Sequence, residues 1–185
     1  MPTGLIVYNA GPLRDGMLIK FKDGQLQGKM SLSQWQGVLD VNLIGTFLCG
    51  REAAAAMPKV VNGGIIINIF SIARAGNIGQ TNYAASKAGV AALVTTWAGE
   101  LKRFGIRAAG IAPCGITSNM TDTIKSEALE RIQNAIPVGR LGDPSELAST
   151  AVFIIENDYV NGPRIQLASA IGGLIPNNTW LGVLK

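Results

Sequence analysis

The sequence predicts an α/β fold, a doubly wound parallel sheet with helices on both faces. Short apolar runs alternate with longer segments whose apolar residues recur at helical spacing, and Gly or Pro often separates them. The run over 65–70 is apolar on both faces of the expected strand, which is typical of a central parallel strand. Repeated strand and helix units joined by short turns require crossover connections, and such connections join parallel strands.

Four strands are expected, and each is an apolar run bounded by a turn. Asn9-Ala10-Gly11 stops the first strand, Ser71 follows the second, and Pro113 ends the third. Gly162-Pro163 precedes the fourth. Residues 12–30 mix polar and apolar positions with several glycines, so we expect loop or a short irregular helix there. The strands cover residues 4–8, 65–70, 106–112 and 164–168.

Four helices are expected from the helical spacing of apolar residues, over 34–57, 83–104, 126–135 and 143–157. Ser31 or Ser33 can cap the first helix. Gly105 is a natural stop for the second, because glycine adopts the left-handed conformation that ends helices. The fourth begins with Asp143-Pro144-Ser145-Glu146, in which the acid caps, Pro takes the first position and Glu the third.

Size and composition indicate a single domain over residues 1–185. With 48% hydrophobic and 15% charged residues, the composition is that of a globular protein. The net charge of +4 is scattered, so no nucleic-acid partner is expected. No apolar run reaches the ~18 residues of a membrane span, and no signal peptide is visible, so we expect no membrane partner and a cytoplasmic location.

The sequence contains no histidine, and this excludes several kinds of site. A Ser-His-Asp triad, a Cys-His pair and a histidine-ligated zinc are all impossible, and no metal site is expected. Cys49 and Cys114 lie in different segments, so we expect two free thiols with structural or incidental roles.

The strongest functional signal is the spacing of Tyr83 and Lys87. Four residues apart on one expected helix, their side chains share a face. The lysine ammonium favours the phenolate, so we expect a lowered pKa at Tyr83 that suits proton transfer. Ser71, at the end of the preceding strand, is expected to polarise an oxygen beside the Tyr83 hydroxyl. A packing tyrosine, a solvated lysine and an ordinary loop serine are the plainer alternatives, and the joint pattern argues against them.

Three segments are expected to converge beside the helix that carries Tyr83. Asn9-Ala10-Gly11, Ser71 and Pro113-Cys114-Gly115 each follow the end of an expected strand. In open parallel sheets, ligands bind in the crevice outside the carboxyl ends of the strands. The sequence therefore predicts an active site at this edge of the sheet.

These motifs together resemble the short-chain dehydrogenase/reductase family, and within it the 3-oxoacyl-(acyl-carrier-protein) reductases. The resemblance covers nearly all of the chain. It implies a Rossmann-like fold and hydride transfer between NADP(H) or NAD(H) and a small carbonyl or alcohol substrate, including one linked to an acyl carrier protein. It also implies a homo-oligomer, a dimer or a homotetramer. The residues that carry it are Asn9-Ala10-Gly11, Asp40-Val41-Asn42, Ser71, Tyr83-Ala84-Ala85-Ser86-Lys87, Pro113 to Met120 and Gly139 to Glu146.

The resemblance implies a catalytic role for four residues. Tyr83 would be the general acid for reduction and the base for oxidation, and Ser71 would hydrogen-bond the substrate oxygen. Lys87 would lower the proton affinity of Tyr83 and hold the nicotinamide ribose. Asn42 would fix a water in a proton relay that reaches Lys87. The implied cofactor contacts are Asn9, Ala10, Gly11, Tyr83, Lys87, Pro113, Cys114, Gly115, Ile116 and Ser118.

Several of these residues have plainer explanations that the sequence leaves open. Asn9 is equally explained by hydrogen bonds that join strands, and Asn42 by a buried amide that needs partners. Thr117 competes with Ser118 as the contact to the nicotinamide carboxamide. Basic residues are explained by a solvated surface or by contact with an acidic acyl carrier, and these are Arg51, Lys102, Arg103 and Arg107.

The sequence also departs from the family pattern. The opening strand, Gly-rich turn and helix that hold the cofactor pyrophosphate are not present, so N-terminal βα units are expected to be missing. This favours an alternative, a truncated non-catalytic relative or fragment that serves as an assembly subunit. Tyr8 stands where a second Asn is usual, and Cys114 replaces a turn glycine. Phe70 replaces a small residue and is expected to crowd the substrate oxygen.

Overall fold

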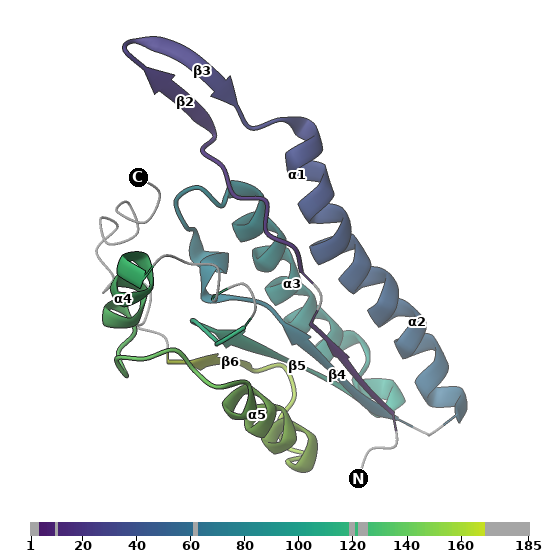
Figure 1. Ribbon diagram of the computed structural model, residues 1–185. Helices are drawn as coiled ribbons and strands as arrows, with labels where there is room; N and C mark the ends of the chain where they lie inside the picture. Colours follow the sequence, from purple (N-terminus) through teal and green to yellow (C-terminus); the bar gives the residue numbers. More distant parts are fainter. Residues whose placement is uncertain (1–3, 10, 61–62, 119–120, 122–125, 169–185) are drawn as a thin grey trace.

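The computed structural model describes residues 4–9, 11–60, 63–118, 121 and 126–168. Its main sheet has the strand order β1-β4-β5-β6, and every neighbouring pair is parallel. Helices α1, α2 and α3 lie on one side of the sheet and α5 on the other (Figure 1). The predicted α/β fold is therefore confirmed. The strands are β1 (Leu5–Tyr8), β4 (Gly64–Ile69), β5 (Ile106–Pro113) and β6 (Arg164–Leu167).

The side chains of β4 alternate between two hydrophobic cores. Ile66 packs with Met57 of α2 (Gly45–Val60) and Trp97 of α3 (Thr81–Glu100). Ile65, Ile67 and Ile69 point the other way and pack with Ile154 of α5 (Pro144–Glu156). Burial on both faces explains why the sequence of β4 is apolar at consecutive positions rather than at alternate ones.

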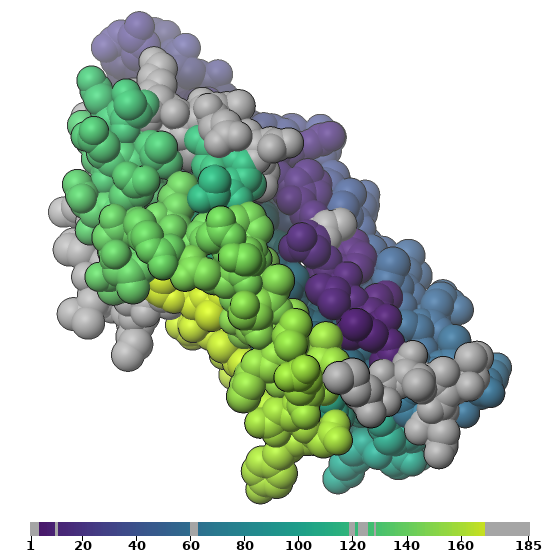
Figure 2. All heavy atoms as spheres, turned by 60° about the horizontal axis from the view of Figure 1, so that its bottom comes forward, coloured from purple at the N-terminus to yellow at the C-terminus, as the bar shows by residue number. Residues whose placement is uncertain are grey.

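Strand β1 lies at one edge of the main sheet, where among the described strands it pairs only with β4. Leu5 is 49% exposed and Val7 43% exposed, whereas Ile6 of the same strand packs against the core beneath α2 and α3. Figure 2 shows β1, in purple, at the surface. The face of β1 that carries Leu5 and Val7 is thus more open than the equivalent face of β4.

The first long helix is interrupted by one wide turn. It consists of α1 (Leu32–Leu39), a π-helical turn η1 (Asp40–Ile44) and α2. Ser31 caps it as predicted, since the Ser31 hydroxyl accepts a hydrogen bond of 3.1 Å from the Gln34 amide. A helix over 34–57 is confirmed in outline, but the π-helical turn around Asn42 was not expected.

Residues 19–29 form an antiparallel hairpin, so the prediction of loop or short helix is wrong for this part of 12–30. Strands β2 (Ile19–Lys22) and β3 (Gln25–Lys29) are joined by Asp23-Gly24, and both turn residues have positive φ. Asp-Gly is the residue pair that two-residue hairpin turns favour, so the signal was present in the sequence. The hairpin projects away from the sheet (Figure 1).

The remaining helices agree with the prediction. The helix that carries Tyr83 ends in a short 3₁₀ segment (Lys102–Phe104), and Gly105 follows with a φ of 68°. Helix α4 covers Ser126–Ala135. Among the described residues, no helix is long and apolar enough to cross a membrane.

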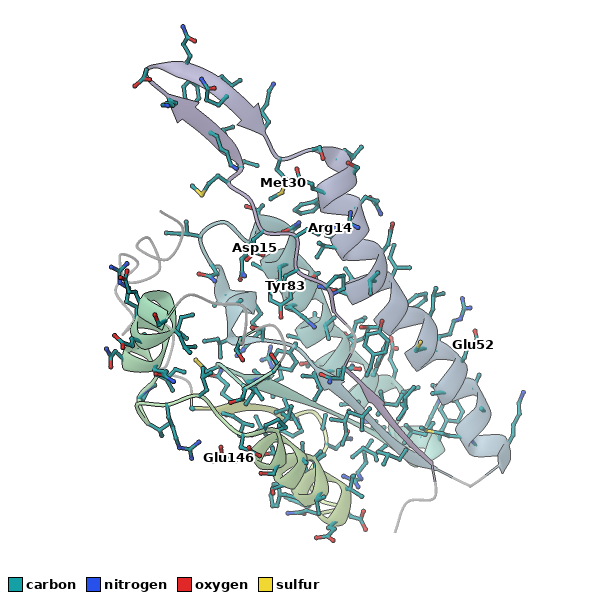
Figure 3. All side chains as sticks on the ribbon, in the orientation of Figure 1. Arg14, Asp15, Met30, Glu52, Tyr83 and Glu146 are labelled. Carbon is teal, nitrogen blue, oxygen red and sulfur yellow. The ribbon has the colours of Figure 1, made fainter. Side chains whose placement is uncertain are left out.

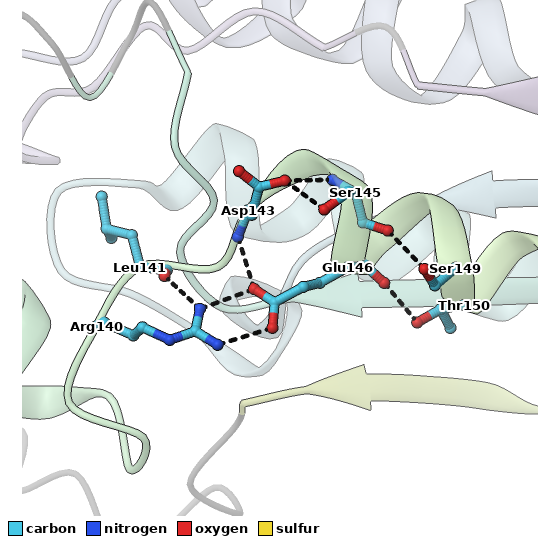
Figure 4. Close-up of polar contacts among 7 residues, drawn as sticks. All are labelled: Arg140, Leu141, Asp143, Ser145, Glu146, Ser149 and Thr150. Carbon is cyan, nitrogen blue, oxygen red and sulfur yellow. Dashed lines mark hydrogen bonds and ion pairs between the residues drawn. The ribbon is translucent and has the colours of Figure 1, made fainter.

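The start of α5 is held by the predicted capping residues and by one ion pair (Figure 4). The Asp143 carboxylate accepts from the Ser145 amide at 2.8 Å, and the Glu146 carboxylate accepts from the Asp143 amide at 2.7 Å. Arg140 binds both oxygens of Glu146 at 2.8 Å. These hydrogen bonds, chiefly those from Arg140, lower the pKa of Glu146 to about 2.

Arg107 closes the other end of α5, so neither surface explanation of this residue holds. Its side chain is only 12% exposed and forms an ion pair of 3.3 Å with Asp158. A helix end leaves carbonyl groups without donors, and the planar guanidinium has five N–H groups to offer them. Here the guanidinium donates at 2.9–3.1 Å to the carbonyl oxygens of Ile154, Ile155, Asn157 and Val160.

We expect Arg107→Met to lower the free energy of unfolding by about 2–4 kcal/mol, because it leaves several half-buried carbonyls without a donor. Arg107→Lys should recover part of the loss, since one ammonium reaches fewer of them. Urea unfolding followed by circular dichroism measures both. The control is Arg51→Met, whose exposed partner is the adjacent Glu52, with an expected change within about 0.5 kcal/mol. Equal effects at Arg107 and Arg51 would contradict the capping role.

Candidate active site

Helix α3 and the end of β4 bring Ser71, Tyr83 and Lys87 together. Ser71 directly follows β4, and its hydroxyl accepts a hydrogen bond of 3.1 Å from the Ala73 amide. Tyr83 lies in the first turn of α3, near enough to Ser71 for the serine side chain to act on the pKa of the phenol. The Lys87 Nζ atom lies over the Tyr83 ring, 5.6 Å from its centroid. Two hydroxyl groups and one amine from segments far apart in sequence are therefore gathered at the carboxyl end of β4.

The pKa of Tyr83 is raised above its ordinary value, which corrects the expected lowering. Burial is the main cause, because it penalises the charged phenolate. The nearby Ser71 side chain acts in the opposite direction, and the negative charge of Asp15 adds to the rise. The Lys87 ammonium donates to the Ile69 carbonyl, and it does not lower the pKa of Tyr83 enough to offset the burial. Tyr83 is consequently a protonated acid at neutral pH.

Lys87 is a buried amine, with only 4% of its surface exposed. Its Nζ atom donates a hydrogen bond of 3.1 Å to the carbonyl oxygen of Ile69, the last residue of β4. Burial lowers the pKa of Lys87 to about 8. A lysine with this value changes its charge close to neutral pH, as a proton-transfer group must.

Asn42 is connected to Tyr83 through Ser86. All three lie at the contact of α3 with the π-helical turn, and Asn42 and Ser86 are fully buried. The Asn42 side-chain nitrogen donates to the Ser86 hydroxyl at 3.1 Å, and that hydroxyl donates to the backbone carbonyl of Tyr83 at 2.7 Å. The Asn42 side-chain oxygen is buried without a hydrogen-bond partner in the described residues.

Gly11 lies directly against Lys87 and Asn42. A Cβ atom at Gly11 would stand 3.1 Å from Lys87 Nζ and 3.2 Å from the side-chain oxygen of Asn42. The amine and the unpartnered oxygen thus border the same small space. A side chain at position 11 would fill it, which gives a physical reason for glycine here.

The remaining predicted cofactor contacts also follow strand ends. Asn9 is exposed just after β1, Pro113 closes β5, and Ala10 lies outside the described residues. Beyond β5, a short parallel bridge joins Ile116 to Gly142, with the Thr117 amide donating to the Gly142 carbonyl at 2.9 Å. The chain after β5 is therefore anchored to the loop before α5, close to the carboxyl edge of the sheet.

The turn after that bridge treats Thr117 and Ser118 differently. Thr117 is exposed, while Ser118 is half-buried and its backbone amide and carbonyl are both hydrogen-bonded to the Thr121 hydroxyl, at 2.8 and 2.7 Å. Cys114 is half-buried, and burial raises the pKa of its thiol. Neither cysteine is paired in the described residues.

The Phe70 ring is buried in the hydrophobic core, so the expectation that it crowds the substrate oxygen is wrong. The ring is 2% exposed and packs with Val90, Val94 and Ala112. Gly110 lies beneath it: a Cβ there would come within 2.3 Å of the Phe70 ring. The larger residue at 70 is therefore accommodated by the absence of a side chain at 110.

Two residues that the sequence analysis did not single out hold the start of α3. Asn82 is fully buried and donates to the carbonyl oxygens of Arg14 at 3.1 Å and Gln34 at 3.2 Å. Gln80 donates to the Asp15 carboxylate at 2.9 Å. Figure 3 shows Tyr83 on α3 near the segment that carries Arg14 and Asp15.

A partial signal for Ser86 existed in the sequence. A serine inside a helix commonly bonds back to a carbonyl three or four residues earlier, and Ser86 lies three residues after Tyr83. No local signal reveals Asn82, because its partners come from distant segments.

Comparison with known proteins gives consistent matches over most of the chain. A family model described as Enoyl-(Acyl carrier protein) reductase matches residues 7–167. The (3R)-3-hydroxyacyl-CoA dehydrogenase of Canis lupus familiaris is 40% identical over 176 residues, which are 94% of this chain and 63% of the relative. The 3-oxoacyl-[acyl-carrier-protein] reductase FabG of Thermotoga maritima is 38% identical over 174 residues, covering 92% of this chain and 65% of the relative.

A solved structure shows the same fold. The crystal structure of 3-hydroxyacyl-CoA dehydrogenase type-2 from Mycobacterium avium superimposes with a TM-score of 0.82 at 31% identity, covering 92% of this chain and 67% of that one. The chain spans less than two thirds of the length of the two relatives above. The extent of the family match and the shared fold together show that this chain belongs to the short-chain dehydrogenase/reductase family.

Proposed function

We propose that the chain belongs to an NAD(P)(H)-dependent oxidoreductase that interconverts 3-oxoacyl and 3-hydroxyacyl thioesters carried by coenzyme A or an acyl carrier protein. The substrate class comes from the names of the relatives, which are hydroxyacyl-CoA dehydrogenases and oxoacyl carrier reductases. The observation that carries the proposal is the gathering of Tyr83, Ser71 and Lys87: the Ser71 side chain is near enough to act on the pKa of the Tyr83 phenol, and the Lys87 amine lies 5.6 Å from the centre of the same ring.

In the reductive direction, Tyr83 gives its proton to the substrate oxygen. Its raised pKa keeps it protonated at neutral pH, so it is ready as an acid. The Ser71 hydroxyl donates a hydrogen bond to the same oxygen and stabilises the charge that develops there. Ser86 fixes the first turn of α3 through the Tyr83 carbonyl and so orients the phenol. In oxidation, the same groups act in reverse.

Lys87 supplies the proton that replaces the one given up by Tyr83, and Asn42 helps to hold a water that returns a proton to Lys87. An ammonium has three donors, and the described residues provide Lys87 with one acceptor, the Ile69 carbonyl. The unpartnered oxygen of Asn42 borders the same space at Gly11. A water bound there would accept from Lys87 and donate to Asn42, which restores the hydrogen bonding of both buried groups.

The residues at the carboxyl edge fit the nicotinamide half of the cofactor. A nicotinamide cofactor, when bound, supplies or accepts the hydride. With one N–H group of Lys87 on the Ile69 carbonyl and one on the proposed water, the third, which has no acceptor among the described residues, suits a ribose hydroxyl. The missing side chain of Gly11 allows close approach. Asn9, Pro113 and the turn from Cys114 to Ser118 border this edge. Between Thr117 and Ser118, half-burial favours Ser118 as the carboxamide contact.

A second candidate is a non-catalytic assembly subunit. It is favoured by the exposed apolar face of β1, which carries Leu5 and Val7. Calorimetric titration of this polypeptide with NADPH and NADH separates the two candidates. Micromolar binding supports the enzyme and also identifies the preferred cofactor, whereas no binding supports the subunit.

A homo-oligomer, dimer or tetramer, is part of the proposal. Four large apolar side chains are 41–43% exposed on one stretch of the π-helical turn and α2, namely Val41, Ile44, Phe47 and Leu48. Exposed apolar stretches of this kind mark protein contacts. A single domain over residues 1–185 and a cytoplasmic location also stay predictions.

Tyr83→Phe should reduce the rate of NADPH oxidation with acetoacetyl-CoA by about 10²–10⁴-fold, because it removes the acidic proton and keeps the ring. The measurement is carbonyl-dependent loss of absorbance at the nicotinamide band. Tyr159→Phe is the matched control, since Tyr159 is 99% exposed and should leave the rate unchanged. An unchanged rate in Tyr83→Phe would show that the proton comes from elsewhere.

The buried amine should make stability depend on pH. In the folded chain the pKa of Lys87 is about 8 instead of 10.5, so at intermediate pH the unfolded chain binds more protons and stability rises with pH. Relative to Lys87→Met, the wild type should gain about 2 kcal/mol between pH 7 and pH 9.5. Urea unfolding at both pH values measures the difference. Lys102→Met, at an exposed position, should show no such dependence on pH. If the difference in free energy of unfolding between the wild type and Lys87→Met were the same at both pH values, the lowered pKa would be contradicted.

Phe47→Glu/Leu48→Glu should dissociate the oligomer, because it places two charges in an apolar contact. Sedimentation velocity should show a dimer or tetramer for the wild type and a monomer for the double variant, with unchanged circular dichroism. Val138→Glu, at a position 60% exposed in a loop, should leave the oligomer intact. A wild-type chain that sediments as a monomer would rule out this interface.

A further inference from the structure

Tyr8 reaches from the main sheet to the π-helical turn that carries Asn42. It is the last residue of β1, and its hydroxyl donates a hydrogen bond of 2.8 Å to the carbonyl oxygen of Val41. Tyr8 and Val41 are 33 positions apart. One phenol therefore links the edge strand of the sheet to the residue next to Asn42.

The π-helical turn explains why Val41 needs this donor. In an α-helix, the Val41 carbonyl would accept from the amide of Gly45, four residues later. Here the Gly45 amide donates to Asp40 instead, five residues back. The turn thus deprives Val41 of its usual partner, and the Tyr8 hydroxyl takes that place. Next to it, the Thr46 hydroxyl donates to the Asn42 carbonyl at 2.6 Å.

Gly45 makes room for the Tyr8 hydroxyl. A Cβ atom at Gly45 would lie 2.5 Å from the Tyr8 oxygen but 3.6 Å from the ring carbon that bears it. The backbone of Gly45 is ordinary helix, with φ −59° and ψ −44°, so its conformation does not require glycine. Glycine weakens a helix at such a position, and the close approach of the hydroxyl gives the reason for it.

We propose that Tyr8 and Gly45 form a lock that holds the π-helical turn and thereby positions Asn42 toward Ser86 and Lys87. Tyr8 is a positioning residue, since it acts through Asn42. Asn42 lies in the middle of the five-residue turn, and its amide must reach Ser86 on α3 while its oxygen borders Gly11 and Lys87. The catalytic part of this inference rests on the proposed function, and the structural part does not.

Melting temperatures test the lock, because Gly45→Ala should lower the melting temperature when Tyr8 is present and raise it when Tyr8 is replaced by Phe. Gly45→Ala should lower the melting temperature by about 4 °C, because the new methyl group collides with the Tyr8 hydroxyl. In the Tyr8→Phe background, where only the ring carbon remains at ordinary contact distance, Gly45→Ala should raise it by about 2 °C. Gly99→Ala is the control: a Cβ at Gly99 meets no atom within 4 Å, so it should be stabilising in both backgrounds. The same sign for Gly45→Ala in both backgrounds would overturn the lock.

Kinetic measurements test the positioning of Asn42. Tyr8→Phe should lower kcat for reduction of acetoacetyl-CoA by about tenfold with KM unchanged within a factor of two, since orientation rather than binding is lost. Tyr159→Phe should change neither constant. A variant with normal kcat and a lowered melting temperature would show that Tyr8 is a structural anchor only, and it would overturn the positioning role.

A third readout does not need turnover. The side-chain amide resonances of Asn42 in a ¹⁵N-labelled protein report its hydrogen bond to Ser86. They should shift in Tyr8→Phe and stay in place in Tyr159→Phe. If the wild type does not oxidise NADPH, the proposed function fails. The shift of the Asn42 amide resonances and the effect of Gly45→Ala on the melting temperature still test whether Tyr8 and Gly45 hold the π-helical turn. Unshifted Asn42 resonances in Tyr8→Phe would overturn the lock.

Discussion

Burial of the Lys87 amine is the constraint on which the site depends. An ammonium removed from water must be hydrogen-bonded or must lose its proton. In this fold Lys87 is hydrogen-bonded, and its tendency to hold the proton is also reduced. The last carbonyl of β4 accepts one hydrogen bond, and burial brings the pKa to about 8. The position of the amine in turn requires that no side chain grow from Gly11, so that the loop after β1 approaches it closely.

The polar groups of the site are supported from three directions. The sheet supplies Ser71 at the end of β4, α3 supplies Tyr83 and Lys87, and the π-helical turn supplies Asn42. The side chain of Ser86 connects the last two, because it accepts from Asn42 and donates to the Tyr83 carbonyl. A widened turn in an otherwise regular helix is a common feature of functional sites, since it redirects one side chain.

Local patterns were enough for most of the fold and for the main catalytic residues. Apolar runs identified the four strands of the main sheet, and capping residues marked the starts of two helices. The spacing of Tyr83 and Lys87 predicted that they share a face. The hairpin at Asp23-Gly24 was missed although its turn signal was present. The pKa of Tyr83 was predicted in the wrong direction, because a spacing rule contains no information about burial.

The sequence by itself determined which segments form strands and helices, and that their polar ends carry a serine, a tyrosine and a lysine. These features follow from residues within a few positions of one another, where backbone geometry fixes the spacing. Only the tertiary structure decided that Arg107 closes α5, that Phe70 turns into the core, and that Tyr8 reaches Val41. Those contacts join residues far apart in the chain. They depend on strand order and on the way that helices pack, which no local pattern specifies.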